Sequence, residues 1–378
     1  MSNLLILSPA LRLLPQRAAA VAGRAGWAAA LLVFPLLAVY ALYLSRLSEL
    51  QQEGIGMAEY AMQRLGERVG RAVLLLYGAW FLFYGGFLLR AGADRLAAAV
   101  YPQASPRPFL LSMGLLCLFA ALGKLRSLAR FARVILPLLL SVLLLLLLIS
   151  LKDVQSSNLL PVTILDFPAM LQAGAPALDV LGLGLVLPFF LLPQVERSGP
   201  LWPGLLRCLL QQTLLLTLLG LTVIGKFGAE LAAQLTLPFF TLVRNLVLFQ
   251  SFERMEALIV SCWVFPDFLL VSLCLYTAQY CVRTAFGAAP RIDDGPRFSM
   301  ERMRWVIPLC SLCSMAVGLL LAPDLTSLRR LSDHVIPAMG LIFLLSPILL
   351  DLAGRLQKPE LPVLRFLHAL RRSRRKEQ

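Results

Sequence analysis

Long apolar runs separated by short polar loops are the feature that most constrains this sequence. A bilayer-spanning α-helix needs about 20 consecutive apolar residues, and several of the runs have that length. Hydrophobic residues make up 59% of the 378-residue chain and charged residues only 15%, whereas about a quarter of the residues in a soluble domain are charged. The sequence therefore predicts an all-α, polytopic membrane protein with a single transmembrane domain. The ten runs lie at about 3–15, 27–46, 72–95, 108–123, 132–151, 178–197, 205–225, 255–281, 305–322 and 335–353.

The ten runs divide into two sets of five, which we take as repeats over about 1–152 and 178–354, followed by a basic tail over 355–378. In this division the first and sixth runs hold corresponding places, and both are interrupted by proline. Paired interruptions in corresponding segments are typical of inverted-repeat transporters, whose ligand site lies near the membrane midplane. We therefore expect a 5+5 inverted-repeat bundle.

The sixth run, LDVLGLGLVLPFFLLPQVER over 178–197, contains two glycines and two prolines. Glycine lowers helix stability, and proline lacks the backbone donor and clashes with the preceding turn. A broken helix persists in a membrane only inside a bundle or beside a polar cavity, because its freed backbone groups need partners. We expect a break beside a ligand, with close helix packing as the alternative role of the glycines. The binding candidates on this run are Gly182, Leu183, Gly184 and Pro188.

Basic residues are distributed unequally between the two sides of the predicted membrane. If both termini are cytoplasmic, the inner loops hold most of the arginines and lysines, as the positive-inside rule expects. The loop over 153–177 would then be external, and it contains no lysine or arginine, although Arg329 and Arg330 fall on the external side. The net charge of +14 therefore indicates orientation in the bilayer and lipid contact by the tail, rather than binding of nucleic acid.

Two connecting segments are expected to be structured. In 54–71 the apolar residues follow helical spacing and the charged residues lie on other faces, which predicts an amphipathic helix at the cytoplasmic surface. The segment 229–254 is apolar but interrupted by Pro238 and Arg244. For this segment we expect a re-entrant or interfacial helix rather than another crossing.

The stretch LVRNLVLFQSFERMEALIVSCWVFPDFLLVSLCLY resembles the spore germination GerAB family, whose members are integral membrane subunits of nutrient germinant receptors. That family belongs to the amino acid–polyamine–organocation transporter superfamily, with its LeuT-like inverted-repeat fold. The resemblance depends on the order of several short motifs along nearly the whole chain. These motifs are Glu59-Tyr60 with Leu65-Gly66, Arg90, Tyr101-Pro102 with Ser105-Pro106, Gly123 with Arg130, Asn158 to Pro161, Pro238, Arg244, and Phe252 to Ala257 followed by Trp263 and Tyr276.

The resemblance implies an amino-acid-sized ligand near the midplane and two partner proteins, a larger membrane subunit and a lipoprotein, in the inner spore membrane. Ser8 and Pro9 on the first run would line the site together with the sixth run. The family's first helix has a polar half before its break, whereas this sequence begins almost at Pro9. We therefore expect further in-frame residues upstream, and the alternative is a truncated, non-functional paralogue.

Further candidates lie on the third and eighth runs. Trp80 and Tyr84 would cover the ligand with their ring faces, or pack as ordinary membrane aromatics. Asp267 lies near the middle of a span, where a carboxylate is costly and by default functional. It would bind the ligand amine or a proton, or else pair with a structural partner. Structural roles are expected for Arg90, Arg130, Arg244, Glu253, Arg254, Glu256 and Trp263.

Two functions therefore stay open from the sequence. One is a receptor subunit that binds a small amino acid and triggers germination, and the other is a proton-coupled amino acid permease that uses Asp267. The sequence contains no P-loop, HExxH or GxSxG motif, which argues against an enzyme. Cys310 and Cys313 form a CxxC without a second pair of ligands, so we expect neither a metal site nor a cofactor.

Overall fold

A computed structural model describes residues 7, 14–50, 56–100, 105–192, 199–235, 237–245, 256–287, 305–321 and 325–357, and these residues include no strand. The longer helices are α2 (Ala29–Leu50), α3 (Met57–Val100), α4 (Arg107–Leu122), α5 (Leu125–Ser150), α7 (Ala175–Phe190), α8 (Trp202–Gln234), α11 (Glu256–Ala285), α12 (Val306–Leu320) and α14 (Ile336–Gln357). Shorter elements are η1 (Gly23–Ala28), η2 (Leu151–Asp153), η3 (Ser156–Asn158), η4 (Ile164–Asp166), α6 (Phe167–Ala173), α9 (Pro238–Arg244), α13 (Leu325–Arg330) and the π-helical turn η6 (Leu331–Val335). Each predicted run after the first coincides with a helix, which confirms the all-α class.

The length and apolar character of the helices identify a polytopic membrane protein. Within the described residues, six helical stretches are long and apolar enough to cross a bilayer. Helices α6 and α7 meet at a bend of 45° and add a seventh stretch if the pair is one span, while α4 and α12 are shorter apolar helices. The first stretch, Leu14–Glu49, joins a helix over 14–22 to α2 through the 3-10 turn η1.

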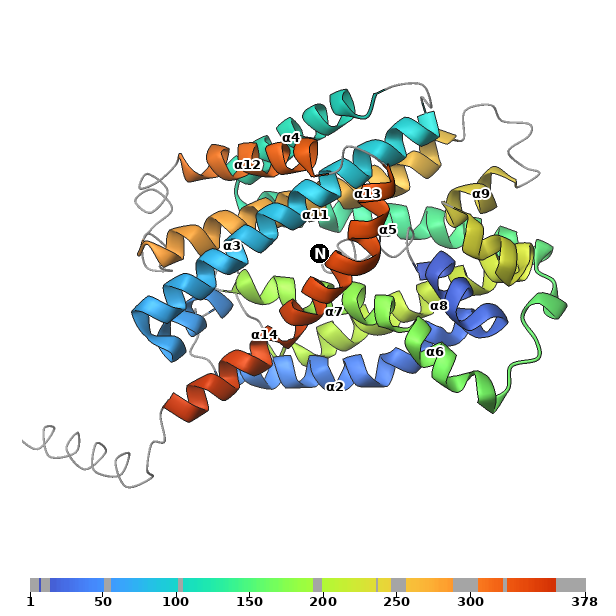
Figure 1. Ribbon diagram of the computed structural model, residues 1–378, viewed down its shortest axis with the longest axis horizontal. Helices are drawn as coiled ribbons and strands as arrows, with labels where there is room; N and C mark the ends of the chain where they lie inside the picture. Colours follow the sequence, from blue (N-terminus) through green and yellow to red (C-terminus); the bar gives the residue numbers. More distant parts are fainter. Residues whose placement is uncertain are drawn as a thin grey trace, which may run out of the picture.

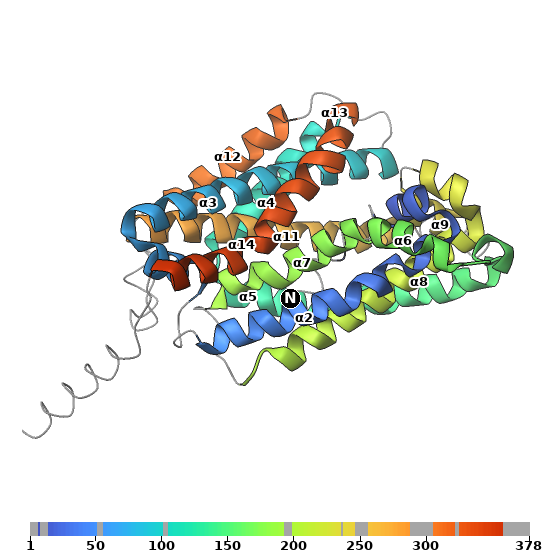
Figure 2. The ribbon, with the colours of Figure 1, turned by 60° about the horizontal axis from the view of Figure 1, so that its bottom comes forward.

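Helix α14 runs between two groups of helices, as Figure 1 shows. One group contains α3, α4, α11 and α12, in which α3 packs along the other three. The other contains α2, α7 and α8, in which α2 contacts both of its neighbours. Helix α14 contacts α3 of the first group and α7 of the second, and the same division is visible in the turned view of Figure 2. A displacement of α14 would therefore affect both groups.

Small residues let α3 and α12 approach closely. An ideal Cβ atom at Gly86 would lie 2.6 Å from the backbone oxygen of Ser314, and one at Gly318 would lie 2.9 Å from the backbone oxygen of Gly86. The Ser314 hydroxyl donates a hydrogen bond to the backbone oxygen of Leu82 at 3.1 Å. This is the usual way in which membrane helices associate, because small side chains maximise van der Waals contact between the backbones.

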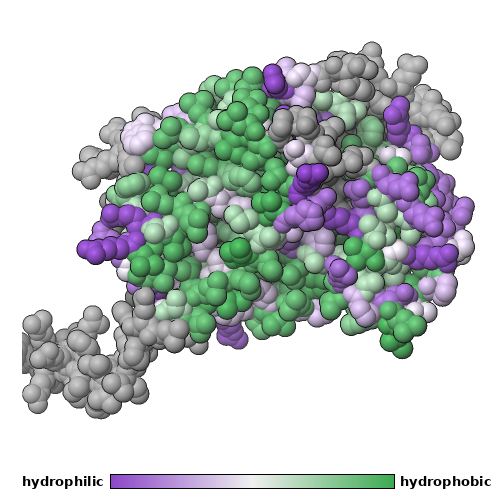
Figure 3. All heavy atoms as spheres, in the orientation of Figure 1, coloured by the Kyte–Doolittle hydropathy of each residue, from purple (hydrophilic) through white to green (hydrophobic). Residues whose placement is uncertain are grey.

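Large apolar side chains lie exposed on the outer faces of several helices, where a lipid environment accommodates them. In Figure 3 hydrophobic residues cover most of the left and centre of the face shown, and hydrophilic residues gather towards the right. The exposed side chains include Leu115, Leu116 and Phe119 on α4, Leu138, Leu144, Leu145 and Leu148 on α5, and Ile342, Leu349 and Leu352 on α14.

Two glycines in the left-handed backbone region interrupt long helices at the places where we expected structured connecting segments. Gly66 (φ 78°) divides α3, so that Met57 begins a short helix ahead of the membrane-spanning part. Gly228 (φ 74°) divides α8 in the same way, and α9 follows a few residues later. A helix is therefore present in the predicted segment 54–71 from Met57, but it is interrupted at Gly66 rather than continuing to residue 71. In 229–254 the structure describes the end of α8 and the short helix α9, and most of the remainder lies outside the described residues, so a re-entrant or interfacial placement stays a prediction.

Candidate functional site

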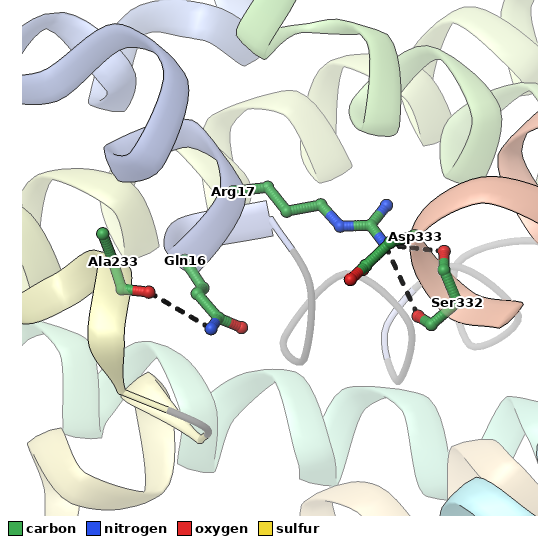
Figure 4. Close-up of polar contacts among 5 residues, drawn as sticks. All are labelled: Gln16, Arg17, Ala233, Ser332 and Asp333. Atoms are coloured by element: carbon green, nitrogen blue, oxygen red, sulfur yellow. Dashed lines mark hydrogen bonds and ion pairs between the residues drawn. The ribbon is translucent and has the colours of Figure 1, made fainter. Parts of the chain in front are cut away.

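Arg17, on the helix over 14–22, connects the N-terminal part of the chain to the π-helical turn that precedes α14. Its Nη2 atom donates to the backbone oxygen of Ser332 at 2.6 Å and lies 2.5 Å from Oδ1 of Asp333. The arginine side chain is only 17% exposed, so water screens this ion pair weakly on the arginine side. Figure 4 shows the guanidinium pointing from the N-terminal helix towards Ser332 and Asp333.

The neighbouring residue Gln16 points the other way. Its Nε2 atom donates to the backbone oxygen of Ala233 at 3.2 Å, in the part of α8 that follows the Gly228 break. The N-terminal helix is thus hydrogen-bonded on one side to α8 and on the other to the start of α14. Single-turn π-helices are frequent at functional sites, and here one carries both acceptors of Arg17.

Asp179 lies one turn into α7 and was not among the predicted site residues. Its carboxylate rests directly against Gly340 of α14, where an ideal Cβ atom would overlap one carboxylate oxygen and lie 3.0 Å from the other. The charge of Arg17 acts on this carboxylate. The sequence signal for Asp179 is an acid at the beginning of the apolar sixth run. A carboxylate in a membrane segment is costly and by default functional, which is the same reason that makes Asp267 a candidate.

The break expected in 178–197 is not found at Gly182, Gly184 or Pro188, because α7 continues as a helix from Ala175 to Phe190, and Pro193 lies outside the described residues. The bend lies earlier, between α6 and α7. Gly182 packs against Leu344 of α14, whose side chain occupies the position that a Cβ atom would take. Gly184 is buried, and Leu183 and Pro188 are half-buried. The contact of Gly182 agrees with the alternative of close helix packing.

Aromatic side chains join the middle of α3 to α7 and α14. The rings of Phe190 on α7 and Phe343 on α14 stack with centroids 5.7 Å apart, and Phe81 on α3 meets both rings edge-on. The predicted pair Trp80 and Tyr84 stacks along α3 with centroids 5.5 Å apart, and both side chains are buried. Trp80 Nε1 has no hydrogen-bond partner among the described residues. A buried indole N–H without a partner is a donor that a bound molecule can satisfy.

Asp267, on α11, forms a buried ion pair with α3. Its Oδ2 atom lies 2.6 Å from Nη2 of Arg95, and the two side chains are 6% and 7% exposed. Gly92 lies against the same carboxylate. Arg90, one turn earlier on α3, pairs with Asp94 at 3.0 Å. The ion pair with Arg95 supports the structural alternative for Asp267, and the pair of Arg90 with Asp94 supports the structural role that we expected for Arg90.

The opposite end of α14 is held by a second carboxylate. Asp351 is buried and accepts a hydrogen bond from the hydroxyl of Tyr60 at 3.0 Å, while the hydroxyl of Tyr43 lies 3.4 Å from its other oxygen. Glu59, next to Tyr60, accepts a hydrogen bond from Tyr280 of α11. The short helix ahead of Gly66 is therefore attached to both α14 and α11.

Tyr60→Phe is expected to lower the free energy of unfolding by about 1.5–3 kcal/mol, because it removes a hydrogen bond to a buried charged group. The midpoint of thermal unfolding in detergent measures the effect. Tyr43→Phe is the comparison, and it should cost less because its contact with Asp351 is longer. Equal losses for the two variants would contradict this assignment.

The other predicted residues divide by whether the structure describes them. Arg130 on α5 is exposed, and Arg244 is exposed in the last turn of α9. Glu256 begins α11 and Trp263 lies within it, but their side chains are outside the described part. Ser8, Pro9, Glu253 and Arg254 lie outside the described residues altogether.

A family model described as spore germination protein matches residues 4–294, from the N-terminal segment to just beyond α11. No curated protein matches the chain.

Proposed function

The chain belongs to the spore germination protein family, and on this basis we propose that it is the membrane subunit of a nutrient-germinant receptor. In this proposal a small amino acid binds within the helix bundle and triggers germination. The observation that carries the proposal is the family match, which includes every element of the candidate site up to α11. The ligand acts by binding one arrangement of the helices more tightly than another.

The contacts of Arg17 support a two-state element of this kind. They connect the N-terminal helix to the start of α14, and α14 contacts both groups of helices. A ligand that binds to Arg17 would alter these contacts and so change the position of α14. Its site would lie between the N-terminal segment, α7 and α3, with Ser8, Pro9, Gly184 and Trp80 among its lining residues.

The 5+5 inverted repeat is part of the same proposal. Its support is the pair of left-handed breaks at Gly66 and Gly228, each beside a short helix between the second and third segments of a repeat. In this arrangement the basic end of the chain and the Tyr60 end of α14 face the cytoplasm. The inner spore membrane is the proposed location, and a larger membrane subunit and a lipoprotein are the proposed partners. Co-purification from spores tests the partners.

Spores that lack this chain are expected to lose the germination response to at least one amino acid and to regain it when the gene is restored. Germination is followed as the fall in optical density of a spore suspension after each amino acid is added. An unchanged response to every amino acid would rule out the receptor function.

Gly184→Leu is expected to abolish this response without lowering the amount of protein in the spore membrane, because Gly184 is buried in α7 at the proposed site. Gly204→Leu on α8 is the matched control, because Gly204 is exposed and an added Cβ atom meets nothing within 4 Å. A normal response in the Gly184 variant would remove this residue from the site.

A proton-coupled amino acid permease is the second candidate, and Asp179 favours it. A half-buried carboxylate in an apolar helix is typical of ion pathways. Uptake of radiolabelled amino acids into vesicles that contain only this chain separates the two functions. Concentrative uptake driven by a proton gradient would favour the permease, and binding without uptake would favour the receptor.

A further inference from the structure

Three charged side chains from three separate elements gather beside the start of α14. Arg17 comes from the N-terminal helix, Asp333 from the π-helical turn, and Asp179 from α7. Asp333 is 53% exposed, whereas Asp179 is half-buried. The cluster therefore has an outer acid, an inner acid and one base, which forms an ion pair with the outer acid.

Arg17 uses only part of its hydrogen-bonding capacity. All of its contacts with the described residues go through Nη2, to Ser332 and Asp333. A guanidinium has five N–H donors, and its hydrogen bonds to a carboxylate are charge-assisted. Within the described part of the chain, Nε and Nη1 have no acceptor, so Arg17 keeps N–H donors that can donate to a ligand carboxylate.

Asp179 has the complementary property. No described residue donates a hydrogen bond to it, although it lies in an apolar helix of the bundle where an unpaired carboxylate is costly. Its position depends on Gly340, because any larger residue there would overlap the carboxylate. One turn further along the same two helices, Leu344 fills the space beside Gly182. Between α7 and α14, Gly340 thus leaves space for the carboxylate of Asp179, and one turn further on the contact between Gly182 and Leu344 is apolar.

We infer that Arg17 and Asp179 together bind the two charged groups of a zwitterionic α-amino acid. A free N–H donor of Arg17 donates to the ligand carboxylate, and the Asp179 carboxylate accepts hydrogen bonds from the ligand ammonium. This inference rests on the proposed function, and it adds the residues that select the ligand class. In this inference the ligand lies between Arg17 and Asp179, and the described residues show no direct hydrogen bond between the two side chains.

The experiment uses the full chain purified in detergent. The twenty common amino acids are screened by thermal shift, and the one that stabilises the protein most is carried forward with its methyl ester and its N-acetyl derivative. The ester lacks the negative charge, and the N-acetyl derivative lacks the positive charge. Each derivative is expected to bind about ten-fold or more weakly than the free amino acid, because each loses a charge-assisted contact.

Each variant is expected to bind the free amino acid more weakly, but to bind the derivative that lacks the corresponding charge as well as the wild type does. Asp179→Asn is expected to weaken the free amino acid by about ten-fold or more while leaving the N-acetyl derivative unchanged. Arg17→Gln is expected to weaken the free amino acid but not the methyl ester. Glu67→Gln is the control that should alter neither, because Glu67 is 75% exposed and pairs with Arg71 on α3.

The outcomes separate this inference from the proposed function. If an amino acid binds with equal affinity to the wild type and to Asp179→Asn, the inference is overturned and the receptor proposal stands. If no amino acid binds and no germination response depends on the chain, both fail. Should a variant not fold, the two derivatives still test the inference on the wild type, and equal binding of all three compounds overturns it.

Discussion

Asp267→Ala is expected to lower the free energy of unfolding by about 3–5 kcal/mol, the usual cost of removing one partner from a buried ion pair. The substitution leaves the Arg95 guanidinium buried between α3 and α11 without its principal counter-charge. The free-energy cost of burying a charge is not offset when the opposite charge is missing. The measurement is the thermal unfolding midpoint in detergent, together with the amount of folded protein recovered.

A double variant distinguishes a structural ion pair from a ligand-binding carboxylate. Arg95→Met with Asp267→Leu is expected to recover most of the lost stability, since apolar replacement of both partners is often neutral or better. Glu67→Ala is the control, and it should cost at most about 1 kcal/mol because its pair with Arg71 is exposed. If the double variant is as stable as the wild type and still responds to the amino acid, Asp267 has no part in binding. If it is stable but unresponsive, the ligand role survives.

Gly86→Leu is expected to produce the second large effect, a loss of about 3 kcal/mol, the upper end of the usual cost of overpacking. A Cβ atom at Gly86 would lie 2.6 Å from the backbone oxygen of Ser314 and 2.7 Å from a γ-carbon of Val317. The first of these neighbours is backbone, which a rotamer change cannot move, so α12 as a whole must shift away from α3.

Gly204→Leu again serves as the matched control for Gly86→Leu. The same substitution at that exposed helical position meets no neighbour and replaces glycine with a better helix former, so it should leave stability equal or slightly higher. Unfolding midpoints and monodispersity in detergent are compared for the two variants. Similar midpoints would mean that α3 and α12 are not closely packed in the membrane.

The helices could be predicted from the sequence because the signal is local. An apolar run of sufficient length forms a helix in a membrane whatever its neighbours are, since its backbone has no other hydrogen-bond partners there. The short helix ahead of Gly66 could be predicted in the same way, because its amphipathic spacing and its glycine are local features. The prediction that glycine interrupts the helix was wrong at Gly182, where Leu344 of α14 packs against a continuous helix.

The candidate site was less predictable because it depends on how the helices are rotated about one another. Whether Asp267 faces Arg95 or a ligand is decided by the contact between α3 and α11, which leaves no trace in either run alone. Arg17 and Asp333 are separated by more than 300 residues, and only the packed bundle brings them together. Asp179 was not predicted, because the glycines beside it in the sequence indicate a role for the backbone of that run and not for a side chain.

Asp333 and Asp351 fix α14 near both of its ends, and this stretch is long and apolar enough to cross a bilayer. Asp333 and Asp351 are about 27 Å apart at a rise of about 1.5 Å per residue. One is fixed by Arg17 and the other by Tyr60. A helix that is fixed at both ends cannot tilt until the contacts at one end break. By linkage, any free energy that weakens the contact of Asp333 with Arg17 lowers the free energy needed to break the contact of Asp351 with Tyr60. Occupancy near Arg17 would then be readable near Tyr60 by a protein that never touches the ligand.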